Sequence, residues 1–204
     1  AEAVLDAIRD DTYAFIFANF PNVDVVGHIE NEAAILQAVE AVDRNLGRVV
    51  EAATRAGLTV VVSADHGTVE KWLYPDGTID TGHTDSPVPF LVLDPDGPAP
   101  LRPSGELTDI APTVLDRMGL PVPAAMTGRS LLSAPRSGQK PARRLLLLVL
   151  DGWGHAPAGP GNLIARAQTP HMDRLCQTCP PALLAAAGEA VGLPEGTVGN
   201  SEAG

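Results

Sequence analysis

Cysteine, positive charge, aromatic residues and long apolar runs are all scarce in this sequence of 204 residues. Only two cysteines occur, Cys176 and Cys179, which excludes a disulfide framework and leaves a structural zinc site without its second pair of thiols. Ordinary helix-end residues are therefore the preferred interpretation of this pair. This cysteine usage fits a reducing compartment, and we expect a cytoplasmic protein.

Positive charge is equally limited, with 14 Lys and Arg against 25 Asp and Glu, a formal net charge of −11. This balance argues against nucleic acid or an anionic membrane surface as a partner. The apolar run at residues 145–150 is far shorter than the roughly 20 residues needed to cross a bilayer, and no run is longer. An acidic protein that handles anions would need metal ions or helix N-termini.

Short apolar runs alternate with helical stretches along the chain. This pattern predicts an α/β protein with a mostly parallel central sheet and helices on both faces, because strands that are apolar throughout are covered on both sides. The length predicts a single domain, residues 1–204. The expected strands are residues 13–17, 58–62, 89–93 and 145–150.

The clearest predicted helix covers residues 31–56 and ends at Gly57. A second helix is expected at 109–118 with Thr108 as its N-cap, and a third begins at Thr169, which is followed by proline. The apolar positions of the first helix recur at helical spacing: Ile35, Val39, Val42, Leu46, Val49, Val50 and Ala53.

Two stretches predict irregular structure. Residues 94–105 are rich in proline and predict a surface loop. Residues 133–144 are small, polar and basic, and predict a linker or a junction between two pieces.

Three aspartates, Asp24, Asp65 and Asp151, come shortly after strand-like runs. In open α/β sheets ligands bind beyond the carboxyl ends of the strands, so these side chains are candidates for a binding site. A single aspartate at such a position more often caps a helix or a turn, and the occurrence of three together favours a site.

Three histidines lie in glycine-flanked segments, and two of them have an aspartate nearby. His28 follows Asp24 by four residues, His66 adjoins Asp65, and His83 precedes the expected third strand. Mixed nitrogen and oxygen ligands suit zinc, manganese or iron better than magnesium or calcium. A metal site is one interpretation, and satisfied polar residues are the other.

The remaining candidates carry weaker signals. His155 is expected in a loop and His171 in the first turn of a helix, and neither is a preferred ligand. Ser201 is a serine in a glycine-rich tail, a pattern that most often marks a turn. A serine hydroxyl becomes a good nucleophile only where a base or a metal lowers its pKa.

Taken together, these motifs resemble the phosphatase-type domain of the cofactor-independent (2,3-bisphosphoglycerate-independent) phosphoglycerate mutases, in the alkaline phosphatase superfamily. The resemblance covers most of the chain. The matching segments are VDVVGH (23–28), SADHGTVE (63–70), GHTDSPVPF (82–90), LTDIAPTVLDRMGLPVPAAMTGRSLL (107–132), VLDGWG (149–154), TPHMDRL (169–175) and GEAVGLPEGTVGNSEAG (188–204).

The resemblance implies an alkaline-phosphatase-like fold with two divalent metal ions, usually Mn²⁺, with Zn²⁺, Mg²⁺ or Co²⁺ as alternatives. It assigns Asp24, His28 and His83 to one ion, and Asp65, His66, Asp151 and Ser201 to the other. It also implies that Ser201 carries a phosphoryl group between the two oxygens of a phosphoglycerate, the 3- to 2-phosphoglycerate step of glycolysis.

The order of the segments departs from that family. Residues 1–132 resemble its C-terminal part and residues 145–204 its N-terminal part, with the linker 133–144 between them. The second domain, which in the family holds the phosphoglycerate, has no counterpart here. We hypothesise a circular permutant of the phosphatase domain, with a fragment or a fusion as the alternative.

These departures leave three functional hypotheses open. The first is metal-dependent phosphotransfer on a small phosphorylated substrate, with a partner chain that would supply the missing substrate-binding residues. The second is a stand-alone metal-dependent phosphomonoesterase. The third is a non-catalytic fragment that binds metal or phosphate.

Overall fold

The computed structural model describes residues 1–95, 97–133, 141–194 and 198. Ser201 lies outside the described residues, as does most of the expected linker. The relation between the two chain ends, on which the permutation hypothesis depends, lies outside them as well.

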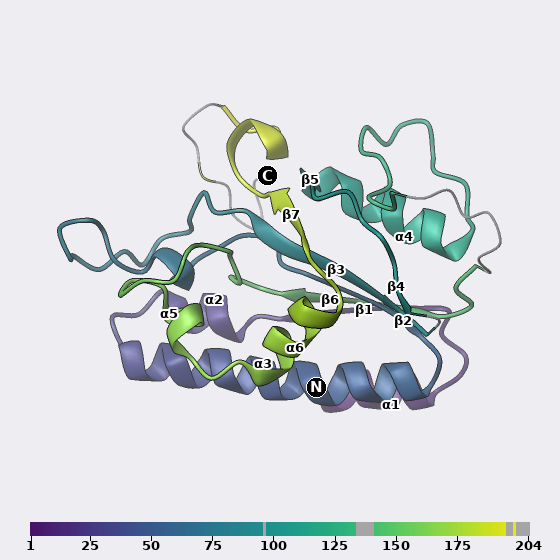
Figure 1. The fold of residues 1–204 in the computed structure, drawn as a ribbon, viewed down its shortest axis with the longest axis horizontal. Helices are drawn as coiled ribbons and strands as arrows, with labels where there is room; N and C mark the ends of the chain where they lie inside the picture. Colours follow the sequence, from purple (N-terminus) through teal and green to yellow (C-terminus); the bar gives the residue numbers. More distant parts are fainter. Residues whose placement is uncertain (96, 134–140, 195–197, 199–204) are drawn as a thin grey trace.

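A mixed sheet forms the centre of the molecule, with the strand order β1-β6-β2-β3-β7-β5 and β4 paired to β3 (Figure 1). β1, β6 and β2 are parallel to one another, whereas β3 runs antiparallel to both β2 and β7. The expected α/β class is confirmed. The strands are β1 (Phe15–Phe20), β2 (Thr59–Ser63), β3 (Val88–Asp94), β4 (Gly97–Pro98), β5 (Ser104–Glu106), β6 (Leu145–Leu150) and β7 (Ala182–Ala185).

Helices lie on both sides of this sheet. The long α3 runs below the strands in Figure 1, with α1, α2, α5 and α6 on the same side, and α4 lies on the other side. The α-helices are α1 (Glu2–Arg9), α2 (Asn22–Gly27), α3 (Glu32–Arg55), α4 (Ile110–Met118), α5 (Leu163–Arg166) and α6 (Pro170–Thr178). The 3-10 turns are η1 (Val69–Lys71), η2 (Leu107–Asp109) and η3 (Gly188–Val191).

The predicted apolar stripe of α3 is confirmed, since every residue in it is buried. Asn31 caps the helix through its side chain, which accepts a hydrogen bond from the Ala34 amide, and the helix ends next to Gly57. Burying this stripe against the sheet gives the helix most of its stability, because isolated helices are marginal in water.

Three predictions, of a strand boundary, a helix cap and a loop, were wrong. The first strand is Phe15–Phe20 instead of residues 13–17, because it pairs with the full length of β6 as far as Leu150. Thr108 is not an N-cap: a 3-10 turn precedes α4, and Glu106 caps that turn in a reciprocal capping box with Asp109. The proline-rich stretch 94–105 contains β4 and the start of β5, which gain backbone partners from β3 and β7.

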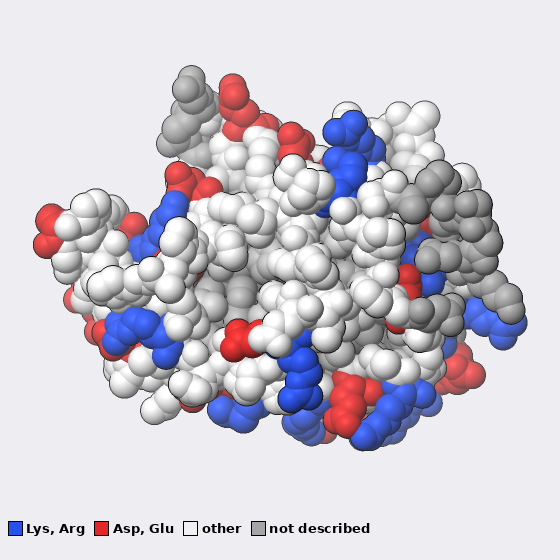
Figure 2. Space-filling model, in the orientation of Figure 1, with Lys and Arg blue, Asp and Glu red and all other residues white. Residues whose placement is uncertain are grey.

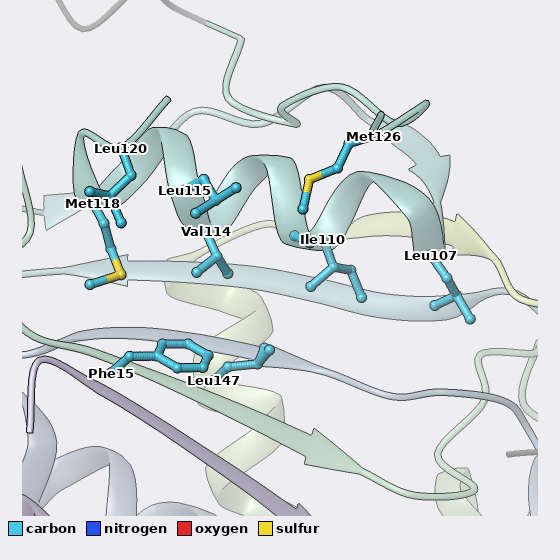
Figure 3. Close-up of a pocket in the computed structure, with 10 residues that line it drawn as sticks. Phe15, Leu107, Ile110, Val114, Leu115, Met118, Leu120, Met126 and Leu147 are labelled. Carbon is cyan, nitrogen blue, oxygen red and sulfur yellow. The ribbon is translucent and has the colours of Figure 1, made fainter. Parts of the chain in front are cut away.

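An apolar cavity of about 470 Å³ lies between α4 and the sheet. Figure 3 shows Ile110 and Val114 of α4 pointing towards Phe15 and Leu147 on the strands below. Its lining residues are all apolar, and they offer no charged or polar side chain that could bind an ion.

Charged side chains are interspersed on the face shown in Figure 2, and blue and red alternate along its lower edge. Ion pairs join some of the charged side chains of the molecule, with Arg48 of α3 bonded to Glu2 at 2.7 Å and Arg55 to Glu51 at 2.5 Å. Within the described ranges, no helix combines the length and the apolar character that a membrane span requires.

The two cysteines lie at the end of α6, as expected for helix-end residues. Cys176 is within the helix and Cys179 follows its last residue, and both thiols are free. Burial raises the pKa of both, which disfavours the thiolate that redox and metal chemistry use.

Candidate metal centre

The candidate site lies where three adjacent parallel strands end. β1 leads into α2, which carries Asp24; β6 leads directly to Asp151; and β2 is followed closely by Asp65. The carboxyl ends of parallel neighbours open at the same sheet edge, so the three carboxylates converge. Asp24 lies in the first turn of the short helix α2.

Asp24, His28 and His83 form one compact group of possible ligands. Oδ1 of Asp24 lies 3.2 Å from Nε2 of His28 and 3.1 Å from Nε2 of His83. The two Nε2 atoms are 3.3 Å apart. Three ligand atoms so close together can bind one cation from one side.

The orientation of His28 is set by a hydrogen bond on its far side. Nδ1 lies 2.7 Å from the carbonyl oxygen of Thr81, a contact in which Nδ1 carries the proton. Nε2 then keeps its lone pair and faces the cluster, the arrangement typical of a metal-binding histidine. The His28 side chain is 43% exposed, so this end of the site opens to solvent.

Asp24, His66 and Asp151 form a second compact group. Nε2 of His66 lies 3.5 Å from Oδ1 of Asp151 and 3.9 Å from Oδ1 of Asp24. Asp65 lies beside this group, with its Oδ2 3.6 Å from the same nitrogen. The group is deeper than the first, since the His66 side chain is only 3% exposed.

The two groups touch each other. Asp24 belongs to both, and the rings of His66 and His83 stack with their centroids 3.7 Å apart. Apart from Ser201, which lies outside the described residues, the predicted ligands therefore lie together at one edge of the sheet. The grouping differs from the expected one in that Asp24 reaches both halves.

The surroundings of Asp151 disfavour its ionised form. Burial raises its pKa, and the charges of Asp65 and Asp24 raise it further, while a hydrogen bond from the Asn19 amide at 2.9 Å opposes this shift. Among the described residues, no hydrogen-bond donor reaches its buried Oδ1. A cation at this point would neutralise the crowded charge, so the donor set fits a divalent metal.

Three supporting residues were not predicted. Asn19 bonds to Asp151, and the Thr68 hydroxyl donates to Oδ1 of Asp24 at 3.1 Å. Gly152 has a φ of +79°, and a Cβ there would lie 2.8 Å from the Asp24 backbone, so the loop after β6 requires glycine. The only sequence signal for these residues was their position beside a strand end or inside a motif.

Other candidates stand apart from both groups. His155 is in a loop and His171 is in the first turn of α6, both as expected, and neither belongs to a described ligand group. Lys71 pairs with Asp85 at 2.5 Å, and this contact lowers the pKa of that carboxyl.

Comparison with known proteins agrees with the composition of this site. The family model described as the Metalloenzyme superfamily matches residues 1–122 and 143–204. The unmatched stretch between these ranges includes nearly all of the expected linker.

Curated relatives share one name, 2,3-bisphosphoglycerate-independent phosphoglycerate mutase. The protein of Thermosynechococcus vestitus is 46% identical over 143 aligned residues, and the match covers 66% of this chain and 27% of that protein. The protein of Thermomicrobium roseum is 45% identical over 144 aligned residues, and that match covers 68% of this chain and 27% of that protein. The chain thus spans about a quarter of the length of these relatives. The family model covers most of the chain, and the chain belongs to the Metalloenzyme superfamily.

Proposed function

We propose that this chain carries out metal-dependent phosphotransfer on a small phosphorylated substrate, with Ser201 as the group that is phosphorylated. The observation that carries the proposal is the pair of ligand groups that meet at Asp24. The name shared by the relatives points to a phosphoglycerate as the substrate.

The ligands for two divalent ions would come from the two groups. Asp24, His28 and His83 would hold one ion, and His66, Asp151 and Asp65 the other, with Ser201 as a further ligand. Manganese is our first choice of metal. Bound divalent ions would neutralise phosphate charge and lower the pKa of a coordinated hydroxyl, which is how an acidic protein can bind an anion.

The chain itself would supply the nucleophile and the scaffold that carries it. The Ser201 oxygen would form a bond to phosphorus while the ester bond to the substrate oxygen breaks, and the departing alkoxide takes up a proton. The phosphoryl group then passes to the other hydroxyl of the glycerate, which regenerates serine. The assignment of Ser201 rests on the sequence pattern.

The test is a reaction of the full chain with 3-phosphoglycerate after loading with Mn²⁺, stopped with chelator and followed by phosphorus NMR. We expect a growing 2-phosphoglycerate signal, which the Ser201→Ala variant should lose while it retains most of its metal binding. Inorganic phosphate as the sole product would support a phosphomonoesterase instead. An unchanged spectrum of protein with confirmed metal content would contradict phosphotransfer by this chain.

Glu189 offers a control for Ser201→Ala. The Glu189→Gln variant alters the same C-terminal region, where Glu189 lies in η3, but removes no proposed ligand or nucleophile. It should retain turnover if the loss in Ser201→Ala reflects the missing hydroxyl.

A further inference from the structure

Glu70 is a buried carboxylate that belongs to neither ligand group. It is only 2% exposed, and it lies in η1 shortly after β2. Among the described residues, no lysine, arginine or histidine is within ion-pair distance of it, and its partners are neutral donors. A carboxylate buried in this way is costly unless its surroundings use it, because the charge loses its hydration.

The hydrogen bonds of Glu70 connect two loops that carry proposed ligands. Oε2 accepts from the Thr68 amide at 2.9 Å, and Oε1 accepts from the Thr84 hydroxyl. Thr68 lies two residues after His66, and Thr84 directly follows His83. One carboxylate therefore binds both of the chain segments that carry these two stacked imidazoles.

Glu70 also contacts the third ligand loop. A Cβ added at Gly154, three residues after Asp151, would overlap the Glu70 carboxylate, so this loop packs directly against it. The Thr68 backbone, held by Glu70, in turn places the hydroxyl that donates to Oδ1 of Asp24.

We propose that Glu70 is a positioning residue of the metal centre, which fixes the three ligand-bearing loops relative to one another through Thr68, Thr84 and Gly154. The inference rests on the proposed metal-binding function. It gives the buried carboxylate a role outside the coordination sphere, where hydrogen-bonded partners hold ligands in their binding geometry.

A second buried carboxylate provides a matched control. Asp43 is fully buried and, like Glu70, accepts two hydrogen bonds, in its case both from backbone amides, those of His171 at 3.1 Å and Met172 at 2.8 Å. It ties α3 to α6, and within the described residues its hydrogen bonds reach no ligand-bearing loop. Asp43 and Glu70 thus share burial and bonding but differ in what they hold.

The experiment measures Mn²⁺ affinity by calorimetry, and the absorption spectrum of the Co²⁺-loaded protein, for the full-length chain and three variants. We expect Glu70→Ala to weaken Mn²⁺ binding by about tenfold or more, the effect typical of lost outer-shell partners, and to change the Co²⁺ spectrum. Glu70→Gln keeps an acceptor for Thr68 and a donor for the Thr84 oxygen, so it should stay within about threefold of the unmodified chain. Asp43→Ala should lower the melting temperature without changing either metal readout.

The possible outcomes separate this inference from the proposed function. An unmodified chain that binds no Mn²⁺ would refute the metal function and, with it, the role of Glu70. Tight binding by the unmodified chain and equally tight binding by folded Glu70→Ala would refute the positioning role alone. If Glu70→Ala fails to fold, Glu70→Gln decides: a loss of affinity as large as that expected for alanine would show that the hydrogen bonds alone do not position the ligands.

Discussion

At the scale of single residues, the site depends on charge crowding. Asp24, Asp65 and Asp151 converge beside His66, and the most buried of the carboxylates, Asp151, has a raised pKa, primarily because of burial. In the metal-free protein this aspartate opposes folding once it ionises. The same crowding favours binding of a divalent cation. The close carboxylates therefore lower the stability of the metal-free protein and raise its affinity for metal.

We expect Asp151→Asn to raise the melting temperature of the metal-free protein at pH 7. A folded pKa above the unfolded value means that the unmodified chain loses stability as the pH rises through the folded pKa, and the amide escapes this loss. Asparagine also keeps an oxygen for the Asn19 bond. Thermal unfolding in chelator at several pH values checks this: the advantage of the variant should shrink as the pH falls towards 4. A difference that is constant with pH would show that ionisation is not the cause.

At the scale of elements, the long helix α3 organises the layer beneath the sheet. Its apolar stripe packs on the strands, its Asp43 bonds to the start of α6, and its N-terminus is capped by Asn31. These features are local in sequence or lie on one helix face. They support the fold, and none of them involves a proposed metal ligand.

Asn31→Ala should lower the free energy of unfolding by about 1 kcal/mol, because the Ala34 amide loses its capping acceptor. Asn31→Asp keeps an acceptor and should unfold like the unmodified chain. Urea denaturation measures both variants. Equal stability of the alanine variant would show that the cap contributes nothing, and a change in Mn²⁺ affinity would show that α3 and the site are coupled.

At the scale of the whole molecule, the proposed ligands other than Ser201 come from four separate stretches of chain. Asp24 and His28 lie near the beginning, Asp65 with His66 and then His83 follow in the middle, and Asp151 lies more than 120 residues after Asp24. An ion that takes its ligands from separate stretches of chain binds the folded state and hardly the unfolded one. Metal binding should therefore act on global stability.

We expect Mn²⁺ to raise the melting temperature and chelator to reverse the rise. For a single site, free metal at 100 times its dissociation constant stabilises the folded state by about 2.7 kcal/mol. A titration of the melting temperature against Mn²⁺ concentration measures this. His28→Ala should reduce the rise without abolishing it, because it removes a ligand from one group and leaves the other intact. A melting temperature that does not respond to Mn²⁺, Zn²⁺ or Co²⁺ would contradict the metal centre.

What the sequence determines by itself is local or periodic. The stripe of α3 follows from helical spacing, and the N-terminus of α6 from Thr169 and the proline after it. The placement of Asp24, Asp65 and Asp151 near strand ends follows from where the apolar runs stop. These inferences succeed because hydrophobic periodicity and capping chemistry act over a few residues.

What only the tertiary structure decides is which distant groups meet. The length of β1 and the antiparallel direction of β3 depend on the strands beside them. Asp24 meets His66 and Asp151 because β1, β6 and β2 are neighbouring strands of one sheet. The role of Glu70 was invisible in the sequence, where it is one more acidic residue beside a motif. Its significance comes from three loops that converge on one buried carboxylate, and a contact between residues far apart in the chain exists only once the sheet has brought them together.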